Sequence, residues 1–137
     1  MKFNSLIPEL SVSDFEKSLR FYTNILGFRA EYSRQKPLFA FLSLEGNQIM
    51  IQEINSKWEN GKPEKPFGRG INFQLEVKSI KPLLEALEKN KIKLFSEVEE
   101  NWYKKDNELL GNKEFLVQDP DGYLLRFFED IGNKKAN

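Results

Sequence analysis

The residue types that this chain lacks limit its chemistry more than those it contains. The sequence has no histidine and no cysteine among its 137 residues. It therefore lacks Ser-His-Asp and Cys-His nucleophile pairs, an imidazole base that titrates near neutral pH, and the usual ligands of zinc. Acid or base chemistry would fall to an Asp, Glu, Lys or Tyr with a shifted pKa. A metal would have only oxygen ligands, which suits Mg²⁺ or Ca²⁺.

Two segments of the sequence share the same pattern of strand, turn and strand. Residues 115–129 hold two apolar runs around an Asp-Pro-Asp-Gly turn, in which Pro120 fixes φ and Gly122 tolerates a positive φ. Residues 39–53 repeat the pattern of strand, glycine turn and strand, with Gly46 in the place of Gly122. This internal repetition predicts two hairpins with equivalent positions in a duplicated fold.

Each hairpin is preceded by a short strand and an amphipathic helix at a comparable distance. The sequence therefore predicts two tandem β-α-β-β-β modules, at residues 1–54 and 70–131, within one domain of residues 1–137. The joining segment, residues 55–69, is rich in proline and glycine and is expected to be a linker.

Apolar residues at helical spacing predict helices at 14–26 and 79–89, the first of them capped by Ser13. Strands are expected at residues 5–12, 28–34, 37–44, 48–54, 71–77 and 93–98. The charged stretch 99–111 is interpreted as a long loop, and residues 132–137 as a frayed tail. Trp102, in this loop, is expected to contribute to ligand contact and little to stability.

Composition excludes several classes of partner. With 39% hydrophobic residues the chain can bury a core, and 21 basic residues balance 21 acidic ones. No bulk field attracts nucleic acid or an anionic membrane, and neither a signal peptide nor a membrane-spanning run is recognisable. We expect a cytoplasmic protein.

Several short motifs, in this order and at this separation, resemble the vicinal-oxygen-chelate (glyoxalase-like) superfamily, and within it the bleomycin resistance proteins. They are Ile7-Pro8-Glu9-Leu10, Val12-Ser13-Asp14, Arg20-Phe21-Tyr22, Leu26-Gly27-Phe28, Gly111-Asn112-Lys113-Glu114-Phe115 and Asp119-Pro120-Asp121-Gly122. The resemblance implies an α+β fold in which two β-α-β-β-β modules form curled, cup-shaped mixed sheets, usually completed by a second subunit.

In the enzymes of this superfamily, four equivalent strand positions supply His, Gln or Glu to a divalent metal. The motifs place Ile7, Met50, Asn72 and Arg126 at those positions. Ile7 and Met50 offer no hard donor, and Arg126 brings a permanent positive charge. We therefore predict no metal and no other cofactor.

The bleomycin resistance branch binds a large cationic drug in crevices between two subunits, without metal or catalysis. Our first hypothesis is therefore a homodimer that sequesters a bleomycin-type glycopeptide antibiotic or a similar small molecule and confers antibiotic resistance. Trp102 and Phe39 are expected to hold an aromatic part of the ligand between them. The expected ligand-binding residues are Phe39, Phe41, Glu9, Gln48, Met50, Asn72, Gln74, Trp102, Tyr103, Arg126 and Phe128.

Three alternatives remain open at this point. The chain could be a small-molecule-binding module with no role in resistance. The polar residues that alternate along the strands could face solvent or a polar dimer seam rather than a ligand. The chain could also be a superfamily enzyme with a lost or relocated metal site and Glu9 or Glu76 as a base. Activity that appears on a dicarbonyl, diol or epoxide substrate with added Mg²⁺ or Mn²⁺ would separate the enzyme from the binding protein.

Overall fold

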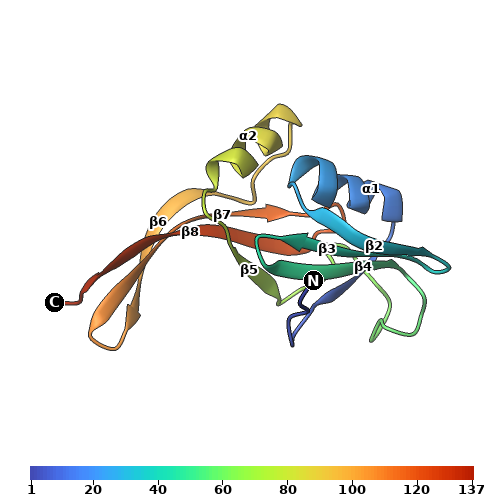
Figure 1. Ribbon diagram of the computed structural model, residues 1–137, viewed down its shortest axis with the longest axis horizontal. Helices are drawn as coiled ribbons and strands as arrows, with labels where there is room; N and C mark the ends of the chain where they lie inside the picture. Colours follow the sequence, from blue (N-terminus) through green and yellow to red (C-terminus); the bar gives the residue numbers. More distant parts are fainter. The chain divides into compact units, whose positions relative to one another are not determined.

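The computed structural model describes residues 1–137 and contains two four-stranded mixed sheets (Figure 1). The elements are β1 (Glu9–Val12), α1 (Phe15–Arg20), the π-helical η1 (Phe21–Ile25), β2 (Arg29–Gln35), β3 (Leu38–Leu44), β4 (Asn47–Glu53), β5 (Asn72–Glu76), α2 (Lys81–Lys89), β6 (Ser96–Lys105), β7 (Glu108–Gln118) and β8 (Leu124–Lys135). The predicted order β-α-β-β-β is confirmed twice along the chain, as is the α+β fold class.

The two sheets have the same topology. The first has the order β1-β4-β3-β2 and the second β5-β8-β7-β6. The outer pairs β1–β4 and β5–β8 are parallel, and the remaining neighbours are antiparallel. Glu9 lies opposite Met50 in the first sheet, as Gln74 lies opposite Arg126 in the second. The repeat seen in the sequence therefore reproduces equivalent register in both sheets.

The chain forms two compact units. The first comprises Met1–Arg69 together with the turn Asp119–Tyr123, and the second comprises Gly70–Gln118 and Leu124–Asn137. The turn that joins β7 to β8 thus belongs to the first unit, although both of its flanking strands belong to the second. The prediction of one domain with modules at 1–54 and 70–131 stays a prediction.

In the first unit, α1 and η1 cover the apolar face of the sheet. Alternate residues of the strands point to this face because side chains alternate along a strand. Phe15, Phe21 and Tyr22 from the helical segment are buried against it, with the ring of Tyr22 edge-on to Phe28. The buried strand residues of this face are Leu10, Val12, Ala40, Leu42, Ile49 and Ile51.

The start of α1 differs in detail from the predicted cap. Asp14 is the N-cap residue, and its side chain accepts a hydrogen bond from the backbone N–H of Lys17 at 3.1 Å. Ser13 donates its hydroxyl to Asp121 instead. Ser13 was therefore the wrong residue for the cap, because a distant carboxylate competes for its hydroxyl.

In the second unit, α2 covers the apolar face of its sheet (Figure 1). Leu83 and Leu87 are its buried residues, Ile80 is buried at its N-cap, and Asn90 is its C-cap residue. The buried strand residues beneath it are Leu75, Phe115, Val117, Leu125 and Phe127, and Val77 is buried directly after β5. The opposite face of this sheet is polar and carries the candidate site.

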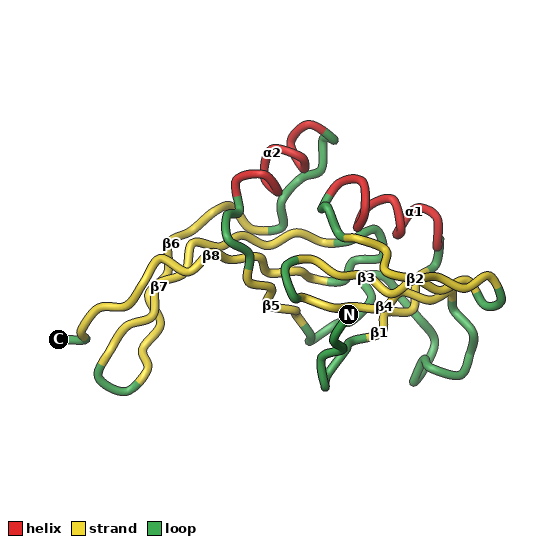
Figure 2. The backbone as a smooth tube through the Cα atoms, in the orientation of Figure 1, coloured by secondary structure: helices red, strands yellow, loops and turns green.

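Two sequence predictions are wrong in the second unit. Residues 99–111 are not a loop but parts of β6 and β7, joined by a tight turn in which Asp106 has a φ of 54°. Residues 132–137 are not a frayed tail, because β8 continues to Lys135 and pairs with Glu108. Figure 2 shows β6, β7 and β8 continuing together as a ribbon beyond β5. Both faces of this ribbon are largely solvated and carry charged residues. The sequence therefore lacks the alternation of apolar and polar residues that would have indicated strands here.

No helix in the structure combines the length and apolar character needed to cross a membrane.

Candidate ligand-binding site

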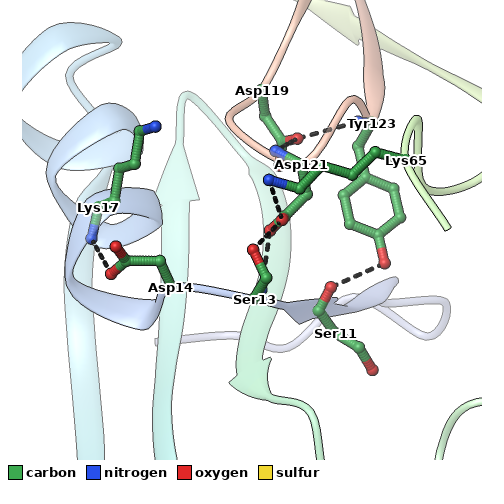
Figure 3. Close-up of polar contacts among 8 residues, drawn as sticks. All are labelled: Ser11, Ser13, Asp14, Lys17, Lys65, Asp119, Asp121 and Tyr123. Carbon is green, nitrogen blue, oxygen red and sulfur yellow. Dashed lines mark hydrogen bonds and ion pairs between the residues drawn. The ribbon is translucent and has the colours of Figure 1, made fainter. Parts of the chain in front are cut away.

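The Asp-Pro-Asp-Gly turn is a structural clamp rather than part of a ligand site (Figure 3). Asp121 is 1% exposed, accepts the backbone N–H of Ser13 at 3.0 Å and forms an ion pair with Lys65 at 3.7 Å. Tyr123 donates its hydroxyl to the backbone carbonyl of Ser11 at 2.9 Å. The turn therefore fixes the end of β1 and the start of α1, all within the first unit.

Asp119 organises the turn from inside. Its Oδ1 accepts the backbone N–H groups of Asp121 and Tyr123 at 3.0 and 2.9 Å, and its Oδ2 accepts the Tyr22 hydroxyl at 2.7 Å. Burial raises the pKa of Asp119 from its ordinary value of 3.8 to about 6, against the lowering effect of these hydrogen bonds. Burial also raises the pKa of Tyr22 well above its ordinary value.

The face of the first sheet opposite α1 is aromatic and closed. Phe39 and Phe41, both expected to bind ligand, are each 1% exposed. Tyr32 stacks on Phe41 with ring centres 5.3 Å apart, and the Arg34 guanidinium lies 4.4 Å from the centre of the Phe39 ring. Phe3 contacts Phe41 edge-on at 5.3 Å. A molecule approaching this face meets Tyr32 and Arg34 before either phenylalanine.

The other expected ligand-binding residues of the first sheet are Gln48, Glu9 and Met50. Gln48 accepts the backbone N–H of Asn4 and donates to the carbonyl of Lys2, both at 2.7 Å. The backbone of Lys2 and Asn4 therefore occupies the side-chain amide of Gln48, which the sequence predicts to bind a ligand. Glu9 and Met50 lie opposite each other on β1 and β4, and Glu9 is exposed.

The second sheet brings several expected residues together on its face opposite α2, which we call the polar face. Gln74, Tyr103, Arg126 and Phe128 lie on it, as does Asn72 at the start of β5. Arg126 donates from Nη2 to the Gln74 side-chain oxygen at 3.1 Å. Glu114 and Leu116 of β7 also border it, so this face joins residues from all four strands of the unit.

Glu114, on β7, is the centre of the polar face. Its Oε2 accepts hydrogen bonds from the Asn101 side-chain amide at 2.8 Å and from the Tyr103 hydroxyl. Its Oε1 lies 3.8 Å from Nη1 of Arg126. The hydrogen bond to Glu114 is the main reason why the pKa of Tyr103 is raised.

Two hollows open on the polar face. One has a volume of about 340 Å³ and is bordered by Asn72, Ser96, Asn101, Leu116 and neighbouring acidic residues, and the other has a volume of about 470 Å³ and lies toward Leu110, Phe128 and Asn133. Tyr103 and Arg126 line both hollows. The two volumes together suit an elongated small molecule.

The hollows are acidic although the chain as a whole is neutral. Arg126 is the only basic residue that lines them. Their carboxylates are Glu76, Glu97, Glu99, Glu114 and Asp130. This excess of negative charge favours a cationic ligand.

Trp102 lies on the other face of the ribbon from Tyr103. A methyl group built on Gly111, its neighbour on β7, would lie 2.6 Å from the Trp102 ring and 2.7 Å from Ile131. Lys134 places its Nζ 4.0 Å from the centre of the ring. Trp102 lines neither hollow, and its pairing with Phe39 around a ligand stays a prediction.

The residues at the superfamily's metal positions do not fit a divalent cation. The side chains of Ile7 and Met50 offer no oxygen, and Asn72 offers one amide oxygen. The guanidinium of Arg126 projects among the acceptors of the polar face, bonded to Gln74 and near Glu114. A positive charge there opposes a bound metal cation.

Sequence reasoning missed Glu114 and Asn101. Glu114 follows a lysine and precedes Phe115, which is buried on the other face, so strand alternation alone could have placed it opposite the core. Asn101 could not be placed, because its stretch was interpreted as a loop and had no predicted face.

Comparisons with known proteins agree with the fold. The family model described as "Glyoxalase/Bleomycin resistance protein/Dioxygenase superfamily" matches residues 3–127. Curated proteins named bleomycin resistance protein, from Geobacillus stearothermophilus and Staphylococcus aureus, are 29% identical over 134 residues, covering 91% of this chain and 96% of theirs.

Solved structures of superfamily members share the fold. The protein from Sphaerobacter thermophilus is 23% identical with a TM-score of 0.62, covering 90% of this chain and 94% of its own. The protein from Alicyclobacillus acidocaldarius is 17% identical with a TM-score of 0.63, covering 94% and 92%.

Proposed function

Because the chain belongs to the glyoxalase/bleomycin resistance protein/dioxygenase superfamily, we propose that it is a non-catalytic binding protein. Its ligand is a bleomycin-type glycopeptide antibiotic or a similar cationic small molecule, which it sequesters and so confers resistance. The curated relatives named bleomycin resistance protein, which match along nearly their whole length, support this assignment.

The acidic polar face is the observation that carries the proposal. A cation placed in these hollows gains from the surrounding carboxylates, most of all where water is partly excluded. The amides of Asn72, Gln74 and Asn101 supply neutral hydrogen-bonding groups beside the charges, and Tyr103 and Phe128 supply ring surface. Such a surface binds a polar, partly aromatic cation without transforming it.

The chain is proposed to act as a homodimer. Each sheet leaves edge strands, β1 and β2 in the first and β5 and β6 in the second, and such edges are commonly covered by a second subunit.

Calorimetric titration with bleomycin tests the function. We expect saturable binding that weakens as salt rises from low to physiological ionic strength, because exposed charges are screened. Glu97→Lys and Glu99→Lys should each weaken binding by roughly 3- to 10-fold, since each reverses one charge of the hollow. Glu88→Lys, on α2, is the control with the same charge change outside the hollows. Absence of saturable binding, or equal weakening by Glu88→Lys, would reject the proposal.

A further inference from the structure

We propose that Glu114 determines specificity for the ligand's positive group and that Arg126 is a built-in competitor for the same carboxylate. This inference rests on the proposed function, because it assigns the cation of the ligand to one oxygen of the polar face. Glu114 and Arg126 belong to the same unit, so one chain supplies both groups.

Glu114 has one satisfied and one unsatisfied oxygen. Its side chain is only 4% exposed. Asn101 and Tyr103 both donate to Oε2, whereas Oε1 is buried and has no hydrogen-bond partner. A buried carboxylate oxygen without a donor is costly, so this oxygen has a strong affinity for any N–H group that reaches it.

Arg126 forms an ion pair with Oε1 of Glu114 but does not donate a hydrogen bond to it. Its Nη1 lies 3.8 Å from Oε1, which is within the range of an ion pair but too long for a hydrogen bond. Its Nη2 is bonded to Gln74, and its Nε is buried without a partner. The guanidinium is thus shared between β5 and β7, and the bidentate pair that Arg and Glu can form is not made.

A cationic group of the ligand can donate the hydrogen bond that Oε1 of Glu114 lacks. The Arg126 side chain is 29% exposed and lines both hollows, so it has room to turn away while Gln74 continues to accept from it. A planar amidinium or guanidinium can donate to Oε1 in a charge-assisted hydrogen bond, with Tyr103 and Leu116 as neighbouring surface. A neutral group of the same shape gains much less there.

Benzamidine is a suitable probe, with benzyl alcohol as its neutral counterpart, and binding is followed by amide chemical-shift titration of the full chain. Glu114→Gln should weaken benzamidine binding by about tenfold or more, because it removes the charge and keeps the shape. Arg126→Gln should strengthen it by roughly 3- to 10-fold, because it removes the competing cation. Glu88→Gln, which loses a carboxylate on α2, should leave it unchanged.

The test remains decisive even if the Glu114→Gln variant does not fold. Native-like amide spectra show that Glu114→Gln is folded; if it is not, Arg126→Gln alone decides, and unchanged or weaker benzamidine binding overturns the proposal. Benzamidine binding that is absent in the natural chain, or equal in Glu114→Gln and Glu88→Gln, also overturns it. Bleomycin is titrated in parallel, so that bleomycin binding without Glu114 dependence rejects this inference and leaves the proposed function standing. Glu114-dependent benzamidine binding without bleomycin binding supports this inference and instead rejects the proposed sequestration of bleomycin-type antibiotics.

Discussion

Asp119 shows how a carboxyl group can set the pH response of the fold. The pKa of Asp119 in the folded chain is about 6, above its ordinary value of 3.8, because the group is buried beside Tyr22, Asp121 and Tyr123. Between these two pH values the folded state keeps the proton that the unfolded state has released. The free energy of unfolding therefore falls as pH rises through this window.

We predict that stability decreases between about pH 4 and pH 6 by on the order of 2–3 kcal/mol through this one group. Urea unfolding at several pH values measures it. Asp119→Asn should flatten this part of the curve, whereas Asp106→Asn, in the exposed hairpin turn, should leave it unchanged. A slope that survives Asp119→Asn would assign the effect to another group.

The β6–β8 ribbon places Trp102 in a strand, where its ring has neighbours to pack against. The sequence predicts a loop residue with little effect on stability, but the ring lies over Gly111, at a point that the side chain of Ile131 also approaches. We now predict that Trp102→Ala lowers the free energy of unfolding by about 1–3 kcal/mol, since it removes the largest side chain on that side of the ribbon. Trp58→Ala, at a side chain that is 66% exposed, should cost much less. Equal effects in thermal unfolding would contradict the packing role.

The two repeated turns provide a matched pair of glycines. Gly46 and Gly122 have φ values of 86° and 96°, so alanine is strained at both. A methyl group at Gly46 meets nothing within 4 Å, whereas at Gly122 it lies 2.6 Å from the backbone Cα of Pro66. We predict that Gly46→Ala costs about 1 kcal/mol and that Gly122→Ala costs a further 1–3 kcal/mol or so by overpacking. Equal melting shifts for the two variants would show that the contact with Pro66 does not constrain the turn.

Sequence reasoning recovered the elements whose patterns are local. The helix from residue 15, its end near Gly27 and the two glycine hairpins follow from apolar spacing and turn chemistry. It failed for residues 99–111, where charged residues alternate on a solvated ribbon and leave no apolar period. It also failed for the link between Ser13 and Asp121, which are far apart in sequence and meet only in the folded chain.

The candidate site was recovered only in part for a similar reason. Gln74, Tyr103 and Arg126 do share one face, but Phe39 and Phe41 are covered by neighbours that the sequence did not identify. Whether an aromatic strand residue is open depends on cross-strand partners such as Tyr32. The special feature of Glu114 is that Oε2 accepts two hydrogen bonds whereas Oε1 accepts none, and a sequence does not contain this difference.

We predict that the protein is a homodimer in solution. Both sheets end in edge strands, and a second subunit commonly covers such edges. Light scattering at micromolar concentration should give a mass near twice the 16.1 kDa of one chain. A mass of one chain that does not change with concentration would contradict this prediction.

Equilibrium dialysis against bleomycin, with mass analysis of the recovered drug, tests whether the protein binds the drug without changing it. We predict that the protein retains the drug at a fixed ratio per chain, that added Mg²⁺ or Mn²⁺ does not alter this ratio, and that the recovered drug has its original mass. Failure to retain the drug would show that the protein does not sequester it, and recovery of a modified product, with or without metal, would show that the protein is an enzyme.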